Sequence, residues 1–286
     1  MSRLPITKTP KPYIGGAFIR SESGRTFLLN DKTGSFFANI PQCTRKDLRN
    51  AVEAAAKAGA SWAKRSAYNR GQILYRLGEM LEARREEMIE TLILFGATKA
   101  AATKEVDAST DRLIYYAGWC DKYEQVLGNV NPVASPYFNF TVTEAMGVVG
   151  VIAPDAPALL GLISMVAPII ASGNSVVVEV SEMNPYPAIL LGELLSTSDL
   201  PGGVVNLLTG FREELLPTFA SHEHIRGISA AVVGADRKTL RLGGADSVKC
   251  VSFVDEKTNW YADKAQDLYA IRDFVEFKTT WHPIGA

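Results

Sequence analysis

The sequence predicts an α/β protein built on a doubly wound, Rossmann-like parallel sheet that carries a small antiparallel arm. The arm is indicated by two segments in which apolar and polar side chains alternate, 137–146 and the tail 271–286. The sheet is indicated by short apolar runs that alternate with helical stretches, because strands covered by helices on both faces are buried throughout. Five such runs occur, at 148–153, 175–180, 204–209, 225–230 and 248–254.

The first half of the chain is predicted to be mainly helical. Thr44 and Asp47 stand three residues apart in front of apolar residues at helical spacing, the pattern of a capping box that begins a helix. Two longer stretches, 69–96 and 105–127, show the same periodicity. A glycine ends the first and directly follows the second, where helices commonly stop.

Composition excludes several classes of function. The chain has 286 residues, 47% of them hydrophobic, and a formal net charge of −1, which indicates a globular protein with a substantial core. Nucleic acids and anionic membranes are bound by concentrated basic faces, so neither partner is expected. The three cysteines form no close pair and the first residues do not form a signal peptide, so we expect reduced thiols in the cytoplasm.

One apolar stretch, 145–173, is long enough to span a bilayer. It contains Asp155 and three prolines, which a membrane span disfavours because a buried carboxylate and a missing backbone donor are both costly in lipid. We therefore expect a strand, a loop and a buried helix there. His222 and His224 are spaced like metal ligands, but no cysteine or carboxylate cluster joins them, so no metal site is predicted.

Eight segments of the chain match one known family in that family's order. They are YIGGAF (13–18), NRGQILYRLGEMLE (69–82), YYAGWCDKY (115–123), EAMGVVGVIAP (144–154), PIIASGNSVVVEVSEMNPYPA (168–188), LPGGVVNLLTGF (200–211), ASHEHIRGISA (220–230) and LRLGGADS (240–247). Any one segment would be weak evidence, but together they show that the chain resembles the aldehyde dehydrogenase superfamily along almost its entire length. The closer likeness is to the second, non-catalytic unit of the family-sixteen enzymes.

The resemblance implies a nicotinamide cofactor domain, a catalytic domain with a cysteine nucleophile, and a β arm that pairs across subunits. After Asp246 this chain reaches its final strand within a short stretch, so the catalytic domain is expected to be missing. Cys250 lies in the apolar run VKCVSFV, where a thiol is expected to be buried and to have a raised pKa. The structural interpretation of Cys250 is therefore preferred to a catalytic one.

The other catalytic parts implied by the family also fail to match. The general-base glutamate is replaced by Arg241, whose guanidinium cannot accept a proton from water. The asparagine that supports the oxyanion is replaced by Ala156, and the neighbouring Asp155 would repel developing negative charge. We therefore predict no catalytic residue in this chain.

Cofactor contacts implied by the family are changed as well. The lysine that holds the adenosine ribose is replaced by Glu179, which reverses the charge near a phosphate-bearing ligand. Val232 and Val233 stand where a glycine and a serine let a helix N-terminus approach the pyrophosphate. Both the close approach and the hydroxyl are lost.

Two positions still match the family's nucleotide contacts. Glu182 matches a carboxylate that contacts ribose, although it could equally serve as an acid at a helix start, and Gly210 survives from a turn in which Arg212 replaces a later glycine. Glu182 and Gly210 are thus the cofactor-binding candidates. No cofactor is expected, and NAD or NADP is the only one that the family implies.

The predicted organisation is a degenerate dinucleotide-binding-type domain, 1–127 and 147–270, with an oligomerisation arm, 128–146 and 271–286. The predicted function is that of a catalytically inactive subunit in assembly or regulation. It would act as a homo-oligomer or docked on a full-length aldehyde dehydrogenase. Two alternatives are an NAD(P)-dependent oxidoreductase whose nucleophile comes from a partner chain, and a weak nucleotide-sensing module.

Overall fold

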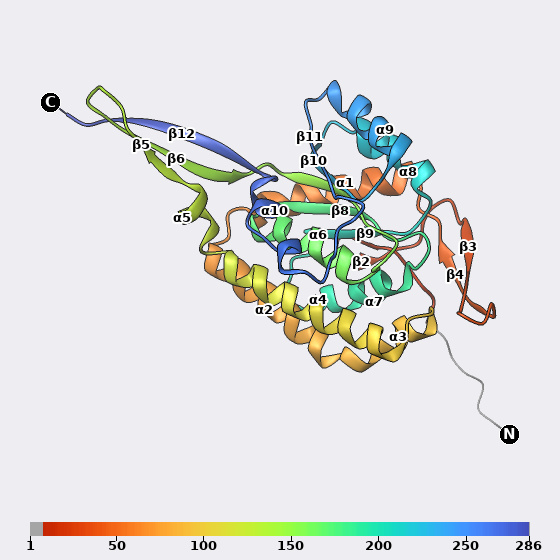
Figure 1. Ribbon diagram of the computed structural model, residues 1–286. Coiled ribbons are helices and arrows are strands. Elements are labelled where there is room, and N and C mark those ends of the chain that lie inside the picture. The colour runs from red at the N-terminus through yellow and green to blue at the C-terminus, as the bar shows by residue number, and fades with distance from the viewer. Residues whose placement is uncertain (1–7, 286) are drawn as a thin grey trace.

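A seven-stranded sheet lies at the centre of the computed structural model, which describes residues 8–285 (Figure 1). Its order is β11-β10-β7-β8-β9-β1-β2, in which the first five strands are parallel and the β1–β2 hairpin adds an antiparallel edge. The five predicted apolar runs are the five parallel strands. The strands are β1 (Tyr13–Ile14), β2 (Ala17–Phe18), β7 (Val148–Ile152), β8 (Ser175–Glu179), β9 (Val205–Leu208), β10 (Ile225–Ala230) and β11 (Cys250–Phe253).

The strand order reverses between β7 and β10. From β7 the chain winds outward through β8 and β9, then returns to the other side of β7 to form β10 and β11. In doubly wound sheets, ligands bind beyond the carboxyl ends of the strands at such a switch point. The residues that follow β7, β8, β9 and β10 therefore line the place where a site is expected.

Helices cover both faces of this sheet, as predicted. Side chains alternate along β7, so Val149 and Val151 pack with α6 and α7 while Val148 and Ile152 face the core shared with α1, α8 and α9. The helices α2, α3 and α4 form a further layer outside α6 and α7 (Figure 1). The bounds are α1 (Arg45–Trp62), α2 (Ala67–Ala83), α3 (Arg85–Leu94), α4 (Lys99–Trp119), α6 (Leu160–Ala171), α7 (Tyr186–Leu195), α8 (Arg212–Ser221) and α9 (Gly234–Ala245).

The predicted capping box is present at the start of α1. The Thr44 hydroxyl accepts from the Lys46 N–H at 3.3 Å, and the Asp47 carboxylate accepts from the Thr44 N–H at 2.7 Å. No helix within residues 8–285 is both long and apolar enough to cross a membrane. The apolar stretch 145–173 instead contains β7, a loop and the buried helix α6.

The two long predicted helices are each divided in two, which the periodicity did not reveal. The first is interrupted at Arg84, which lies between α2 and α3 and whose guanidinium contacts Glu193 on α7 at 2.8 Å. In the second predicted helix, α4 ends at Trp119. After a turn, the short helix α5 (Tyr123–Leu127) leads into the arm. Side chains keep their helical spacing across the one-residue break at Arg84, so the periodicity of the sequence does not show that break.

A three-stranded antiparallel sheet, which we call the arm, projects from the body (Figure 1). It contains β5 (Asn129–Asn131), β6 (Tyr137–Ala145) and β12 (Val275–Pro283) in the order β12-β6-β5. Nine residues of β12 pair with nine of β6, so the tail pairs with 137–146 of the same chain. Ile271 and Phe274 are buried in the main core, and the chain leaves the body at Val275.

The segment between α9 and β12 is short and lies against the body. It holds β11, one 3-10 turn η1 (Asp263–Ala265) and the single-turn helix α10 (Tyr269–Arg272). Arg112 on α4 is buried and donates to the carbonyls of Ala265 at 2.7 Å and Trp260 at 2.8 Å. A separate hairpin, β3 (Thr26–Asn30) with β4 (Phe36–Pro41), packs a small core against α7.

Candidate functional site

The candidate site is the end of the sheet where β7, β8, β9 and β10 give way to their loops. Four charged side chains gather there from three of those connections. Asp155 follows β7, Glu179 ends β8 with Glu182 shortly after it, and Arg212 begins α8 after β9. The fold thus brings together three carboxylates and one guanidinium that are separated in the sequence.

Glu179 and Arg212 form the centre of this group. Arg212 Nε donates to Glu179 Oε2 at 3.2 Å, and Arg212 Nη2 donates to the carbonyl of Ala153 at 3.2 Å. The Glu179 side chain is fully buried and that of Arg212 is 17% exposed. Arg212 therefore reaches from the start of α8 across to the end of β7.

The Glu179 carboxylate is only partly satisfied. Its second oxygen, Oε1, is buried and has no hydrogen-bond partner among residues 8–285. Burial raises the pKa of Glu179 to about 8, against the opposing effect of Arg212, because leaving water disfavours the charged form. Glu182 and Asp155 add to the rise in pKa by like-charge repulsion. Glu179 thus keeps its proton to a higher pH than an ordinary glutamate does.

The two flanking carboxylates are occupied by backbone groups. Glu182 accepts a hydrogen bond from the Arg212 N–H, the first amide of α8, which is a favourable place for an acid at a helix N-terminus. Asp155 Oδ1 accepts from the N–H groups of Glu182 at 3.0 Å and Met183 at 3.3 Å. Both side chains therefore stabilise the loop after β8 and its contact with α8.

Gly210, the other cofactor-binding candidate, lies in a close backbone contact. A Cβ at this position would stand 3.1 Å from the carbonyl oxygen of Cys43. The Cys43 N–H donates to the Thr209 carbonyl at 2.8 Å, which fixes the turn after β9 against the start of α1. Packing alone accounts for a glycine here. The structure places Glu182 and Gly210 on adjacent loops but gives each of them a structural partner.

The turn after β10 is formed by the two valines. Val232 is buried, and its carbonyl accepts from Arg237 Nε at 2.7 Å. Val233 is 52% exposed and occupies the N-cap of α9, where no side chain accepts from the first amides. A β-branched apolar side chain thus stands at the helix N-terminus nearest the switch point.

Cys250 corrects one prediction. The thiol is exposed, because Cys250 begins β11 and β11 is the outer strand of the sheet. Partial burial raises its pKa, and Asp273 adds to that rise. Arg241 stacks on Phe253, with its guanidinium carbon 5.1 Å from the ring centroid. Neither residue lies in the group around Glu179.

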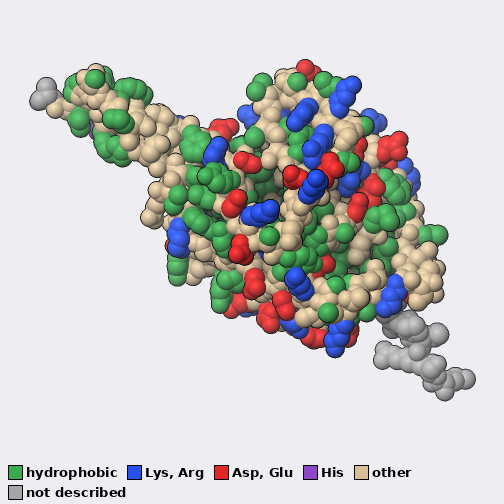
Figure 2. Space-filling view, viewed as in Figure 1, with side chains coloured by type: hydrophobic (Ala, Val, Ile, Leu, Met, Phe, Trp, Pro, Cys, Tyr) green, Lys and Arg blue, Asp and Glu red, His purple; other side chains and the backbone are tan. Residues whose placement is uncertain are grey.

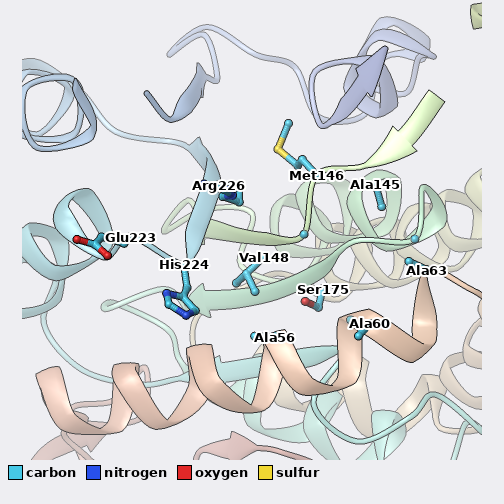
Figure 3. A pocket seen from close by; sticks show the side chains of 13 residues that line it. Ala56, Ala60, Ala63, Ala145, Met146, Val148, Ser175, Glu223, His224 and Arg226 are labelled. Atoms are coloured by element: carbon cyan, nitrogen blue, oxygen red, sulfur yellow. The ribbon is translucent and has the colours of Figure 1, made fainter. Parts of the chain in front are cut away.

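A separate hollow of about 560 Å³ opens at the opposite end of the sheet (Figure 3). Its walls are Ala56, Ala60 and other small side chains of α1, the first residues of β7 and β8, and the turn before β10 with His224. Ligands of doubly wound sheets bind at the carboxyl ends, so this hollow is not part of the candidate site. Within residues 8–285 no three metal-ligating side chains of the His, Cys, Asp or Glu type come together.

Sequence reasoning found the members of the charged group but missed how they combine. Glu179 was interpreted as a reversed charge facing a ligand, and Arg212 only as a lost glycine. The signal that could have predicted the ion pair is that Glu179 and Arg212, which lie at or just after the ends of adjacent strands, carry opposite charges. Strands β8 and β9 are hydrogen-bonded neighbours in a parallel sheet, so their ends lie side by side.

The fold and the charged group define an α/β protein with the strand order of dinucleotide-binding domains. Known proteins identify the family. The model of the aldehyde dehydrogenase family matches residues 18–235, and the chain belongs to that family.

Named relatives agree with this assignment. The chain is 31% identical over 281 residues to the mitochondrial aldehyde dehydrogenase of Rattus norvegicus, covering 90% of this chain and 53% of the relative. It is 31% identical over 268 residues to an aldehyde dehydrogenase of Alternaria alternata, covering 87% and 53%. The NAD⁺ complex of the Bacillus cereus aldehyde dehydrogenase superposes with a TM-score of 0.81 at 27% identity, covering 86% and 50%.

The chain spans about half the length of the relatives that it matches. The family match over residues 18–235 confirms the predicted family, and the superposition confirms the doubly wound fold. None of these three relatives tests the closer likeness to the second unit of the family-sixteen enzymes, which stays a prediction.

Proposed function

We propose that this chain is a catalytically inactive member of the aldehyde dehydrogenase family that acts in assembly or regulation. The observation that carries the proposal is the Arg212–Glu179 pair, which occupies the switch-point end of the sheet with the protein's own side chains. The arm, in contrast, presents its side chains to solvent. Two observations together support the proposal: charged side chains of the chain itself pair at the switch point, and apolar side chains of the arm are exposed.

The residues at the switch-point end of the sheet do not fit a nicotinamide dinucleotide. A phosphate-bearing ligand would meet the carboxyl groups of Asp155, Glu179 and Glu182, while Arg212 is already engaged by Glu179 and the Ala153 carbonyl. Displacing Arg212 would break its hydrogen bonds to Glu179 Oε2 and to the Ala153 carbonyl and leave both buried acceptors without this donor, which is unfavourable. Glu182 and Gly210 remain the only contact candidates.

The chemistry of aldehyde oxidation also lacks support in this chain. Ala156 offers no side-chain donor to an oxyanion, and Arg241 is stacked on Phe253 where the family resemblance implies a base. Cys250 is accessible, but its raised pKa disfavours the thiolate that would have to attack. The short segment between α9 and β12 is held to the body by Arg112.

The arm is the part of the chain that we propose to be functional. We propose that residues 128–146 and 271–286 form an oligomerisation arm, and that 1–127 and 147–270 form the degenerate dinucleotide-binding-type domain. Self-association, or docking on a full-length aldehyde dehydrogenase in the cytoplasm, would cover the arm's exposed apolar side chains.

Two measurements test this proposal. Calorimetry with NAD and with NADP is expected to give no binding in the micromolar range, and aldehydes are expected to reduce neither cofactor above a blank without protein. Glu179→Lys alone should not restore affinity, because Val233 still stands at the α9 N-terminus. Aldehyde-dependent reduction that Cys250→Ala abolishes would refute catalytic inactivity.

A further inference from the structure

The outer edge of β12 is an uncovered strand edge. Within residues 8–285, β12 pairs with β6 on one side only, and each residue from Glu276 to Pro283 is exposed. Such an edge offers a row of backbone donors and acceptors to another strand. In the view of Figure 2 the distal arm carries hydrophobic side chains and few charges. Exposed apolar residues of the arm are Val130, Tyr137, Phe138, Val142, Phe277, Trp281 and Ile284.

The sequence of β12 restricts how two copies of it could pair. Backbone N–H and C=O groups point alternately to the two sides of a strand. In an antiparallel pair of identical strands related by a two-fold axis, one residue must therefore lie directly opposite the same residue of the second copy, and the axis passes midway between the two. An axis at Glu276 or at Lys278 would set like charges directly opposite each other, which is destabilising. An axis at Phe277 would overlap only five residues of the strand. An axis at Thr279 overlaps all nine.

The register centred on Thr279 also gives complementary side-chain pairs. Phe277, 48% exposed, would lie opposite Trp281 of the second copy, which is 58% exposed. Trp281 already contacts Tyr137 edge-to-face with centroids 5.8 Å apart, so each pair would extend an existing aromatic contact. Because of the two-fold symmetry, the pair of Phe277 and Trp281 would occur twice in the dimer.

The charges on the other face of the strand agree with the same register. Within the chain, Glu276 lies directly opposite Glu144 on β6, and the nearby Lys278 forms its ion pair with Glu144 at 3.0 Å. In the register centred on Thr279, His282 of the second copy would lie opposite Glu276 and could donate to it. No like charges would face each other across the new edge.

We propose that two copies of this chain pair through β12, antiparallel and centred on Thr279, to form a continuous six-stranded sheet β5-β6-β12-β12-β6-β5. This inference rests on the assembly role proposed above and specifies its partner as a second copy of the chain. The contact is isologous, so it closes as a dimer and exposes no further β12 edge.

Disulfide mapping tests the register. In a Cys250→Ser background, which leaves only the buried Cys43 and Cys120, the variant Thr279→Cys is mildly oxidised and run on a non-reducing gel. Directly opposed residues have Cα atoms about 4.5–5.5 Å apart, within disulfide range. We expect most of the Thr279→Cys protein to become a covalent dimer. Lys278→Cys or Thr280→Cys alone should not cross-link, because each is displaced along the strand from its own copy.

A second cross-linking assay does not depend on the geometry of the Thr279 pair. Lys278→Cys mixed with Thr280→Cys should cross-link, because these two positions face each other in the proposed register. Neighbouring opposed pairs alternate between hydrogen-bonded and non-hydrogen-bonded geometry, so one of the two assays samples the closer pair. Cross-linking of the variant Phe277→Cys would indicate the alternative register, in which the two-fold axis lies at Phe277.

Sedimentation of the unmodified chain separates the possible results. A dimer with cross-links at Thr279 and between the 278 and 280 variants supports the proposal. A dimer that cross-links at Phe277, or at none of these positions, overturns the register and the β12 contact but leaves self-association standing. A monomer at all concentrations up to about 100 μM overturns both the β12 dimer and the homo-oligomer in the proposed function.

Discussion

The switch-point end of the sheet and the arm differ in how each treats its polar and apolar groups. At the switch point, charged side chains are turned inward and paired, and Glu179 is fully buried. On the arm, large aromatic side chains such as Trp281 are turned outward, and one backbone edge is uncovered. The first region is closed by contacts within the chain, whereas the second is left open. Closure fits a region without a ligand, and exposure fits a region that meets a partner.

The largest effect is expected from breaking the closed region. Arg212→Ala leaves Glu179 buried without a counter-ion and should lower the free energy of unfolding by about 3 kcal/mol at pH 8.5. Urea denaturation measures this. The double variant Glu179→Gln with Arg212→Ala should lose less, because a neutral amide does not need the guanidinium. Equal urea midpoints for Arg212→Ala and the unmodified chain would contradict the importance of the pair.

Shortening the aromatic side chains of the arm should weaken the proposed β12 dimer. Phe277→Thr or Trp281→Thr removes a cross-strand pair worth about 0.7 kcal/mol that the axis repeats, so the dimer Kd should rise about tenfold. Analytical ultracentrifugation measures the Kd. Leu242→Thr, on α9 and 64% exposed, is a matched control that should leave it unchanged. An unchanged Kd in both arm variants would place the interface elsewhere.

The pH dependence of stability should sharpen the description of Glu179. Its pKa in the folded chain is raised from the ordinary 4.5 to about 8, so between these values the folded state holds a proton that the unfolded state has released. Glu179 therefore makes stability fall as pH rises through this window, by on the order of 1 kcal/mol per pH unit. Glu179→Gln should flatten this fall in denaturation at pH 5 to 8. Parallel pH profiles for the two proteins would show that Glu179 does not titrate there.

The smallest effect is expected at the exposed cysteine. Cys250→Ser should change the free energy of unfolding by no more than about 0.5 kcal/mol. In the native protein the exposed thiol should react with a thiol reagent faster than the other two, and Cys250→Ser should abolish that reaction, because Cys43 and Cys120 are buried and burial raises their pKa to about 12. Rapid reaction of all three thiols would mean that the core around α1 and α4 opens readily.

Local patterns were sufficient for much of the fold. Thr44 and Asp47 predicted the start of α1, because a capping box needs only neighbouring residues. The five apolar runs predicted the parallel strands, because burial on both faces removes polar residues from a strand. The alternation in the tail predicted β12. Residue identity alone also predicts that Ala156 and Arg241 depart from the family's catalytic pattern, which stays a prediction.

What the sequence by itself determined was therefore the doubly wound fold and the family. Only the tertiary structure decided that Arg212 pairs with Glu179, 33 residues away, that Cys250 is exposed on an edge strand, and that Arg84 divides a helix. Helical and strand periodicity arise from side chains a few positions apart, so they can be seen along the chain. Ion pairing and exposure depend on which elements become neighbours, and the winding of the strands about β7 sets those neighbours.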